Sequence, residues 1–203
     1  MNSTEAAELK WQKKINLTFS VKFWDECWKM IKNPIIDNKT RWIQFQINRF
    51  ILPTNFSVNK YNINQDPNCS FCPPNTHLEE LSYLLWDCPK VRQFWFSIEI
   101  FLNLFFPSYK LNKKKAIFGD TESDKVINMI LMWGKRYIWR QKFTTRRLDM
   151  ATFHDFLKYK VNELMRIMQF KIKLDEFLER WGKIVNFYAL PIHSPLFFND
   201  IMS

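Results

Sequence analysis

Apolar residues recur at intervals of three and four along most of this chain, and that spacing is typical of helices with one buried face. The clearest pattern runs from Val21 to Ile31, follows Ser20 as a cap for the first turn, and stops before Pro34. Only 3 of the 203 residues are glycine, which disfavours tight hairpins and glycine-rich phosphate loops. We therefore expect an all-α fold, for which 47% hydrophobic residues supply a core.

Further helices are expected beyond this first pattern, and Thr54 is a plausible cap for one of them. The predicted segments are 43–51, 54–61, 78–105 with a pause near Pro89, 127–138 and 153–188. The last is either one helix or two with a kink near Lys173. Between them we expect a cysteine-bearing loop at 62–76, a basic connector at 107–120 and an irregular tail at 190–203. This divides the chain into residues 1–106, with the cysteines, and residues 107–203, with the long helices.

The net charge of +10 and a sequence pI of about 9.5 indicate an anionic partner, either nucleic acid or a negatively charged membrane surface. No apolar run approaches the roughly 20 residues that span a bilayer. The amino-terminal residues also lack the apolar core of a secretory signal. We therefore expect an intracellular protein, nuclear or cytoplasmic, without a membrane partner.

Much of the charge falls between Lys110 and Arg147, where eleven lysines and arginines accompany three acidic residues. Such an excess binds phosphates largely without regard to base sequence, and the interleaved tryptophans can stack on unpaired bases. The alternative is the solvated face of an amphipathic helix, but the uneven placement favours binding. The residues predicted to contact RNA or single-stranded DNA are Lys113, Lys114, Lys115, Arg136, Arg140, Lys142, Arg146 and Arg147.

Three of the four cysteines, Cys69, Cys72 and Cys88, lie within twenty residues of one another. In a reducing compartment this clustering indicates a metal site before a disulfide. The Cys-x-x-Cys pair can hold Zn²⁺ at about 2.3 Å, Cys88 is the obvious third ligand, and a fourth is needed to complete a tetrahedron. Cys27 stands apart within a helical pattern and is expected to be a small buried apolar residue.

The order of residues around these cysteines resembles a known family. After the cysteine pair come Glu79 and Glu80, then Leu-Leu-Trp-Asp-Cys-Pro at 84–89, then Phe94-Trp95. This order is similar to the carboxyl-terminal segment, with its zinc-binding motif, of the reverse transcriptase polyprotein of LINE-type (non-LTR) retrotransposons. The resemblance extends from about Trp11 to about Tyr188. It implies a zinc-binding, non-catalytic domain that holds RNA or single-stranded DNA beside the rest of a reverse transcriptase.

One position departs from the family, because its zinc-binding histidine is replaced here by Tyr83, and a neutral phenol is a poor zinc ligand. The nearest substitute is His77. If residues 77–88 formed one continuous helix, about 16 Å would separate His77 from Cys88. The two can therefore share a metal only if that helix starts late and the chain folds back. The predicted ligands are Cys69, Cys72, Cys88 and His77, and the alternative is a degenerate site with structural or free thiols.

The sequence carries no recognisable catalytic motif. P-loop, nucleophile-elbow, dinucleotide-binding and His-Glu-x-x-His patterns are absent. The polymerase activity of the resembled polyprotein depends on an Asp-Asp pair that this chain does not contain. His154, near a predicted helix start, is expected to cap or to pack. We predict that the chain is not an enzyme by itself.

A competing hypothesis of another class is a helical protein-interaction or scaffold module, or a decayed retroelement fragment that binds no nucleic acid. An exposed apolar patch, in place of a continuous basic surface, would favour this hypothesis.

Overall fold

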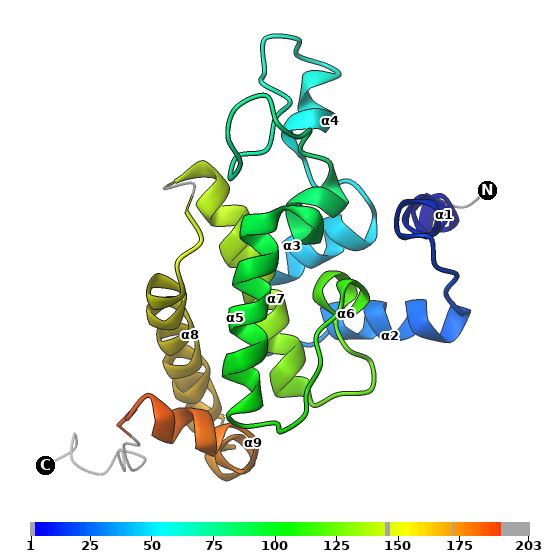
Figure 1. Ribbon diagram of the computed structural model, residues 1–203. Helices are drawn as coiled ribbons and strands as arrows, with labels where there is room; N and C mark the ends of the chain where they lie inside the picture. The colour runs from blue at the N-terminus through cyan, green and yellow to red at the C-terminus, as the bar shows by residue number, and fades with distance from the viewer. Residues whose placement is uncertain (1–2, 145–146, 172, 192–203) are drawn as a thin grey trace, which may run out of the picture. The chain divides into compact units, whose positions relative to one another are not determined.

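The computed structural model describes residues 3–144, 147–171 and 173–191 and confirms the all-α prediction. Its two compact units are Met1–Phe153 and His154–Ser203. The first unit contains α1 (Ser3–Ile15), α2 (Val21–Ile31), α3 (Asn38–Asn48), α4 (Asn55–Asn59), the π-helical turn η1 (Tyr83–Asp87), α5 (Pro89–Asn103), α6 (Lys113–Phe118) and α7 (Lys125–Phe143) (Figure 1). Helix α8 (Met150–Phe170) begins in the first unit and ends in the second, which also holds α9 (Leu174–Phe187).

Both predicted helix caps are confirmed by the structure. The Ser20 hydroxyl accepts a hydrogen bond from the Phe23 backbone N–H at 3.2 Å, at the start of α2. The Thr54 hydroxyl accepts from the Ser57 N–H at 3.2 Å, and the Ser57 hydroxyl accepts in return from the Thr54 N–H at 2.8 Å. Each cap satisfies backbone donors that the first helical turn leaves without a partner.

Helix α7 forms the centre of the first unit, where it packs against α3, α5 and α6. Its closest approach to α5 is at Gly134, where an added Cβ would lie 2.8 Å from the Trp95 ring. The Trp95 indole N–H in turn donates to the Leu85 carbonyl at 2.7 Å, so one buried tryptophan joins α5, α7 and η1. Because α7 belongs to the first unit, the expected division at residues 106/107 does not coincide with the boundary between the two units.

Two helices lie where the sequence pattern predicted none. Helix α1 is anchored by Trp11, which is fully buried and donates its indole N–H to the Ile47 carbonyl at 2.8 Å. Helix α6 lies inside the predicted connector and is capped by Asn112, whose side chain accepts from the Lys115 N–H at 3.0 Å. It ends at Gly119, which has a positive φ of 94°. The basic connector expected at 107–120 thus contains a helix at residues 113–118 that was not predicted.

In the second unit, the long pattern from 153 to 188 belongs to two helices rather than one, since α8 ends at Phe170 and α9 starts after Lys173. The rings of Phe177 and Trp181 are stacked along α9. His154 packs as expected, and its Nδ1 lies 2.7 Å from the Tyr188 hydroxyl. Burial lowers the pKa of this histidine. The predicted irregular tail falls outside the described residues from position 192 onward.

Candidate metal centre and its basic surroundings

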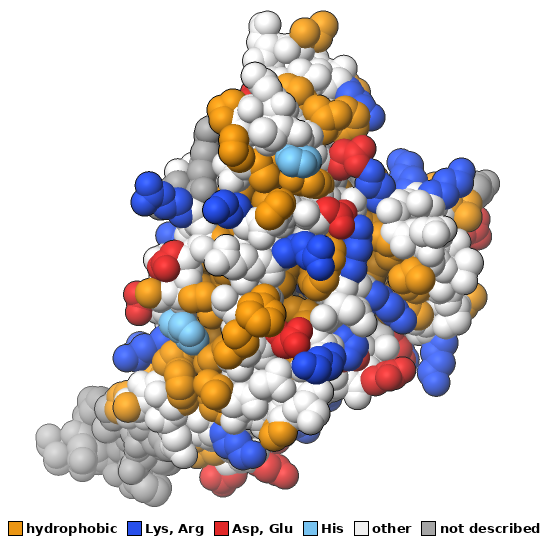
Figure 2. All heavy atoms as spheres, viewed as in Figure 1, with side chains coloured by type: hydrophobic (Ala, Val, Ile, Leu, Met, Phe, Trp, Pro, Cys, Tyr) orange, Lys and Arg blue, Asp and Glu red, His pale blue; other side chains and the backbone are white. Residues whose placement is uncertain are grey.

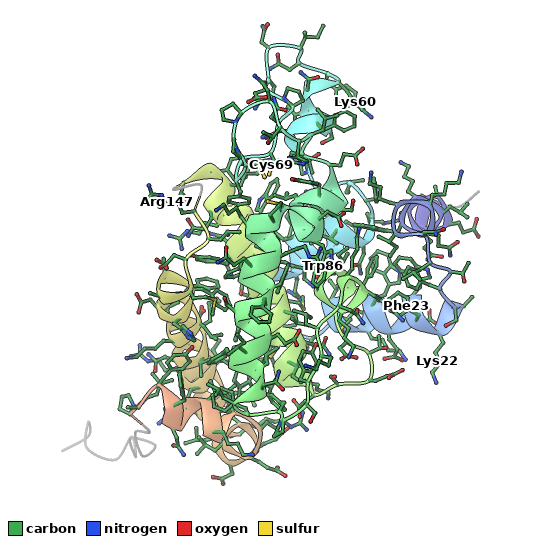
Figure 3. The ribbon with its side chains drawn as sticks, in the orientation of Figure 1. Lys22, Phe23, Lys60, Cys69, Trp86 and Arg147 are labelled. Atoms are coloured by element: carbon green, nitrogen blue, oxygen red, sulfur yellow. The ribbon has the colours of Figure 1, made fainter. Side chains whose placement is uncertain are left out.

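The sulfur atoms of Cys69, Cys72 and Cys88 all lie within 4.8 Å of one another. The Cys88 sulfur is 3.5 Å from that of Cys72 and 3.8 Å from that of Cys69. Cys69 and Cys88 are buried, whereas Cys72 is partly exposed. Figure 3 labels Cys69 beyond the amino-terminal end of α5. The three residues predicted from their spacing are thus brought together, and they could hold a metal ion.

The first two cysteines are presented by a loop of residues 67–79, here called the cysteine loop. Its two ends are paired, because the Cys69 N–H donates to the His77 carbonyl at 2.8 Å and the Glu79 N–H donates to the Pro67 carbonyl at 2.9 Å. At its tip, Asn75 adopts a left-handed conformation with φ of 60°, which asparagine tolerates better than most residues. The loop therefore folds back on itself and places both sulfurs on one side.

Cys88 reaches the cluster from the π-helical turn η1. Its N–H donates to the Tyr83 carbonyl five residues earlier, at 3.0 Å, and Pro89 then begins α5. A π-turn widens the helix so that residues five apart face the same side, and such turns are frequent at functional sites. The helical segment starts at Leu81 rather than at Leu78. Residues 77–88 are thus not one continuous helix, and the 16 Å separation does not apply.

The fourth predicted ligand, His77, is not part of the group formed by the three sulfurs. Its exposed ring stacks instead on the ring of Tyr83, with centroids 5.0 Å apart. The Tyr83 hydroxyl lies 3.5 Å from the Cys72 sulfur. The side chain beside the Cys72 sulfur is therefore that of Tyr83, and not that of His77.

A hydrogen bond between two of the thiols shifts their pKa values in opposite directions. The Cys69 thiol donates to the Cys88 sulfur, which lowers the pKa of Cys88 and raises that of Cys69. Burial raises the pKa of Cys69 further. Burial, and then the hydrogen bond with Cys72, raises the pKa of the Tyr83 phenol.

Glu79 fixes the cysteine loop from inside, and no sequence motif predicted this role. Its fully buried carboxylate accepts hydrogen bonds from the Ser70 N–H at 3.0 Å, the Ser70 hydroxyl at 2.8 Å and the Asn55 N–H at 2.9 Å. It also forms a buried ion pair with Lys142 of α7. One side chain thus connects the loop between Cys69 and Cys72 to α4 and α7.

Four of the predicted nucleic-acid contacts form ion pairs with carboxylates of the chain. The ammonium group of Lys142 is buried against Glu79. The pairs of Lys113 with Asp87, Lys115 with Asp120 and Arg136 with Asp37 have N–O distances of 2.7, 2.8 and 2.6 Å. A count of charges along the sequence does not reveal these carboxylate partners. All of them except the partner of Lys115 come from distant segments of the chain.

The remaining predicted cations differ in their exposure. Lys114 places its ammonium nitrogen 4.3 Å from the centre of the Phe23 ring. Arg140, in the last turn of α7, and Arg147, which follows α7, are exposed. Arg146 lies outside the described residues.

A cavity of about 700 Å³ adjoins the cysteine loop within the first unit. Phe71, which stands between Cys69 and Cys72, lines it together with Lys90 of α5 and with Arg147. Asp149 also contributes to the wall, but its carboxylate accepts from the Thr152 N–H at 2.8 Å at the start of α8. Lys90 was not among the predicted contacts, since it lies outside the basic segment.

Within the described residues, no helix is both long enough and apolar enough to cross a membrane. Comparisons with protein-family models, with curated proteins and with solved structures find no match to this chain.

Proposed function

We propose that this chain is a non-catalytic nucleic-acid-binding module of the kind found at the carboxyl end of LINE-type reverse transcriptases. It binds RNA or single-stranded DNA beside the cysteine loop. The observation that carries the proposal is the cavity lined by Phe71 of that loop together with Lys90 and Arg147. Two cations at the edge of a hollow with an aromatic wall suit a phosphodiester chain with unpaired bases.

The contact surface differs from the one expected from sequence. Lys142 holds Glu79 in the interior and takes no part in it, because an ammonium with a 4% exposed side chain is out of reach of a phosphate. The proposed contacts are Lys90, Arg140 and Arg147, all of them exposed. A metal ion in the cysteine cluster keeps the loop in place, and the resemblance implies zinc, for which the sulfurs supply three of four ligands.

The test compares two triple alanine variants that remove equal charge. The first replaces Lys90, Arg140 and Arg147, and the matched control replaces Lys22, Lys39 and Lys125, which are exposed on α2, α3 and α7. We expect the first variant to bind a single-stranded RNA at least about tenfold more weakly at 50 mM salt. Its plot of log affinity against log salt should be shallower by about 2, since each lost phosphate contact removes about 0.7. Equal affinities and slopes for the two variants would contradict the proposed surface.

A second candidate function is protein interaction, and one surface favours it. Phe96 and Ile100 of α5 and Leu104, which caps the carboxyl end of α5, follow one another at intervals of four and are 62%, 53% and 61% exposed. Figure 2 shows hydrophobic side chains exposed over the path of α5. An apolar stripe of this kind suits a partner helix. If nucleic-acid binding is absent while Phe96→Asp and Leu104→Asp abolish capture of a defined protein partner, this second function replaces the first.

A further inference from the structure

The cysteine cluster offers a metal three sulfur ligands and no obvious fourth. Among the described residues, no histidine nitrogen or carboxylate oxygen joins the group formed by Cys69, Cys72 and Cys88. The Tyr83 hydroxyl lies next to the cluster, 3.5 Å from the Cys72 sulfur, and forms a hydrogen bond with it. The His77 ring stacks on the Tyr83 ring, with centroids 5.0 Å apart, and His77 is not part of the group formed by the three sulfurs.

Metal ions differ in how well they suit such a set of donors. Structural zinc sites are almost always tetrahedral and closed by a fourth nitrogen or sulfur ligand. A phenol oxygen is a hard donor, and a neutral one is weak. Cu(I) is soft, is selected by thiolates, and is satisfied by three of them without a fourth ligand.

We propose that the cysteine cluster is a three-coordinate sulfur site for a soft d¹⁰ cation, represented by Cu(I), and that it holds Zn²⁺ only weakly. Burial of Cys69 and Cys88 shields two of the sulfurs from competing ligands, and the partly exposed Cys72 provides the route of entry. The inference keeps the metal-binding part of the proposed function but replaces the zinc that the resemblance implies by a soft cation, and it does not depend on nucleic-acid binding.

The test uses the metal-free, reduced full chain as wild type, Tyr83→Phe and Tyr83→His. Each is titrated with Cu(I) against a chromogenic Cu(I) chelator and, separately, with Zn²⁺ against a chromogenic zinc chelator. We expect one Cu(I) per chain, with the same affinity in all three proteins, because residue 83 is not a ligand of Cu(I). Zinc affinity should be the same in wild type and Tyr83→Phe, and at least about tenfold higher in Tyr83→His, which supplies a nitrogen ligand.

Several outcomes would overturn the inference. Weaker zinc binding in Tyr83→Phe would show that the phenol is a ligand, and unchanged zinc binding in Tyr83→His would show that residue 83 does not occupy the fourth corner. Cu(I) affinity that depends on residue 83 would exclude a three-sulfur site. Cys72→Ser should weaken binding of both metals, whereas Cys27→Ser, in a buried cysteine outside the cluster, should leave both unchanged. RNA binding is measured separately, and its presence or absence does not change the expected metal affinities of these variants.

Discussion

Glu79 and Lys142 form an ion pair inside the first unit, with side chains that are 0% and 4% exposed. The pair joins the end of the cysteine loop to the last turn of α7, across 63 positions of the sequence. Burial lowers the pKa of Lys142, and the negative charge of Glu79 opposes that shift. Lys142, which belongs to the basic segment between Lys110 and Arg147, thus helps to hold the candidate metal centre in place.

Replacing Lys142 by alanine should strongly destabilise the first unit. The substitution leaves the Glu79 carboxylate buried without a cation, which typically costs about 3–5 kcal/mol. The control is Lys14→Ala, which removes the more exposed ion pair with the neighbouring Glu80 and should cost at most about 1 kcal/mol. Urea unfolding followed by circular dichroism measures both. Similar losses in the two variants would show that the buried pair has no special role.

Lys135 should make stability depend on pH. It is fully buried, donates to the Ile117 carbonyl at 3.1 Å, and has a pKa lowered by burial from 10.5 to about 7. Between these two values the unfolded chain binds more protons than the folded one, so the free energy of unfolding rises with pH across this window. Below pH 7 the cost of burying the charge is fully present.

The variant Lys135→Met isolates this effect. The Ile117 carbonyl keeps a hydrogen bond from the Gln44 side-chain amide at 3.2 Å, so the loss of the ammonium leaves no acceptor without a partner. We expect Lys135→Met to be more stable than wild type at pH 6 by an amount on the order of a few kcal/mol, and the difference to shrink toward pH 10. A stability difference that does not change between pH 6 and pH 10 would contradict the shifted pKa.

Two glycines in helices should respond to alanine in opposite directions. At Gly134 a Cβ would lie 2.8 Å from the Trp95 ring, and overpacking of this kind typically costs about 1–3 kcal/mol. At Gly182 of α9 a Cβ would meet nothing within 4 Å, so Gly182→Ala should stabilise by about 0.5–1 kcal/mol through helix propensity. Thermal or urea unfolding distinguishes the two. Equal effects would argue against close packing of α5 on α7.

Removal of bound metal should loosen the cysteine loop selectively. Without a metal, the loop keeps its backbone hydrogen bonds from Cys69 to His77 and from Glu79 to Pro67, and the hydrogen bond from the Ser70 N–H to the Glu79 carboxylate. We expect faster hydrogen exchange at these amides after treatment with a chelator, and unchanged exchange in the centre of α7. Uniform acceleration throughout the first unit would instead make the metal a requirement for the whole fold.

The sequence predicted helices in which apolar residues recur at regular intervals or a capping residue marks the first turn. Ser20 and Thr54 mark two helix starts, and the apolar spacing located α7 as the shorter segment 127–138 and located α8 and α9 together as one pattern over 153–188. Helix α6 escaped prediction because its buried residues Ala116, Ile117 and Phe118 are consecutive and form no amphipathic stripe. Such a short helix is stabilised by its Asn112 cap and by tertiary burial, and neither shows in a periodicity.

The sequence predicted only part of the candidate site, because the rest depends on contacts that local spacing and charge do not indicate. Cysteine spacing predicted correctly that Cys69, Cys72 and Cys88 meet, since two lie on one turn and the third follows a short helical segment. The position of Tyr83 beside Cys72 depends on the π-turn η1, which the spacing of apolar residues does not indicate. The burial of Lys142 depends on Glu79, whose carboxylate is invisible to a count of local charge.

The most direct measurement of the central claim is binding of wild-type protein to single-stranded RNA and DNA from 50 to 300 mM salt. If Lys90, Arg140 and Arg147 contact phosphates, log affinity should fall linearly with log salt, with a slope of about −2 or steeper. Absence of binding at 50 mM salt, or affinity that does not change with salt, would contradict a nucleic-acid-binding module.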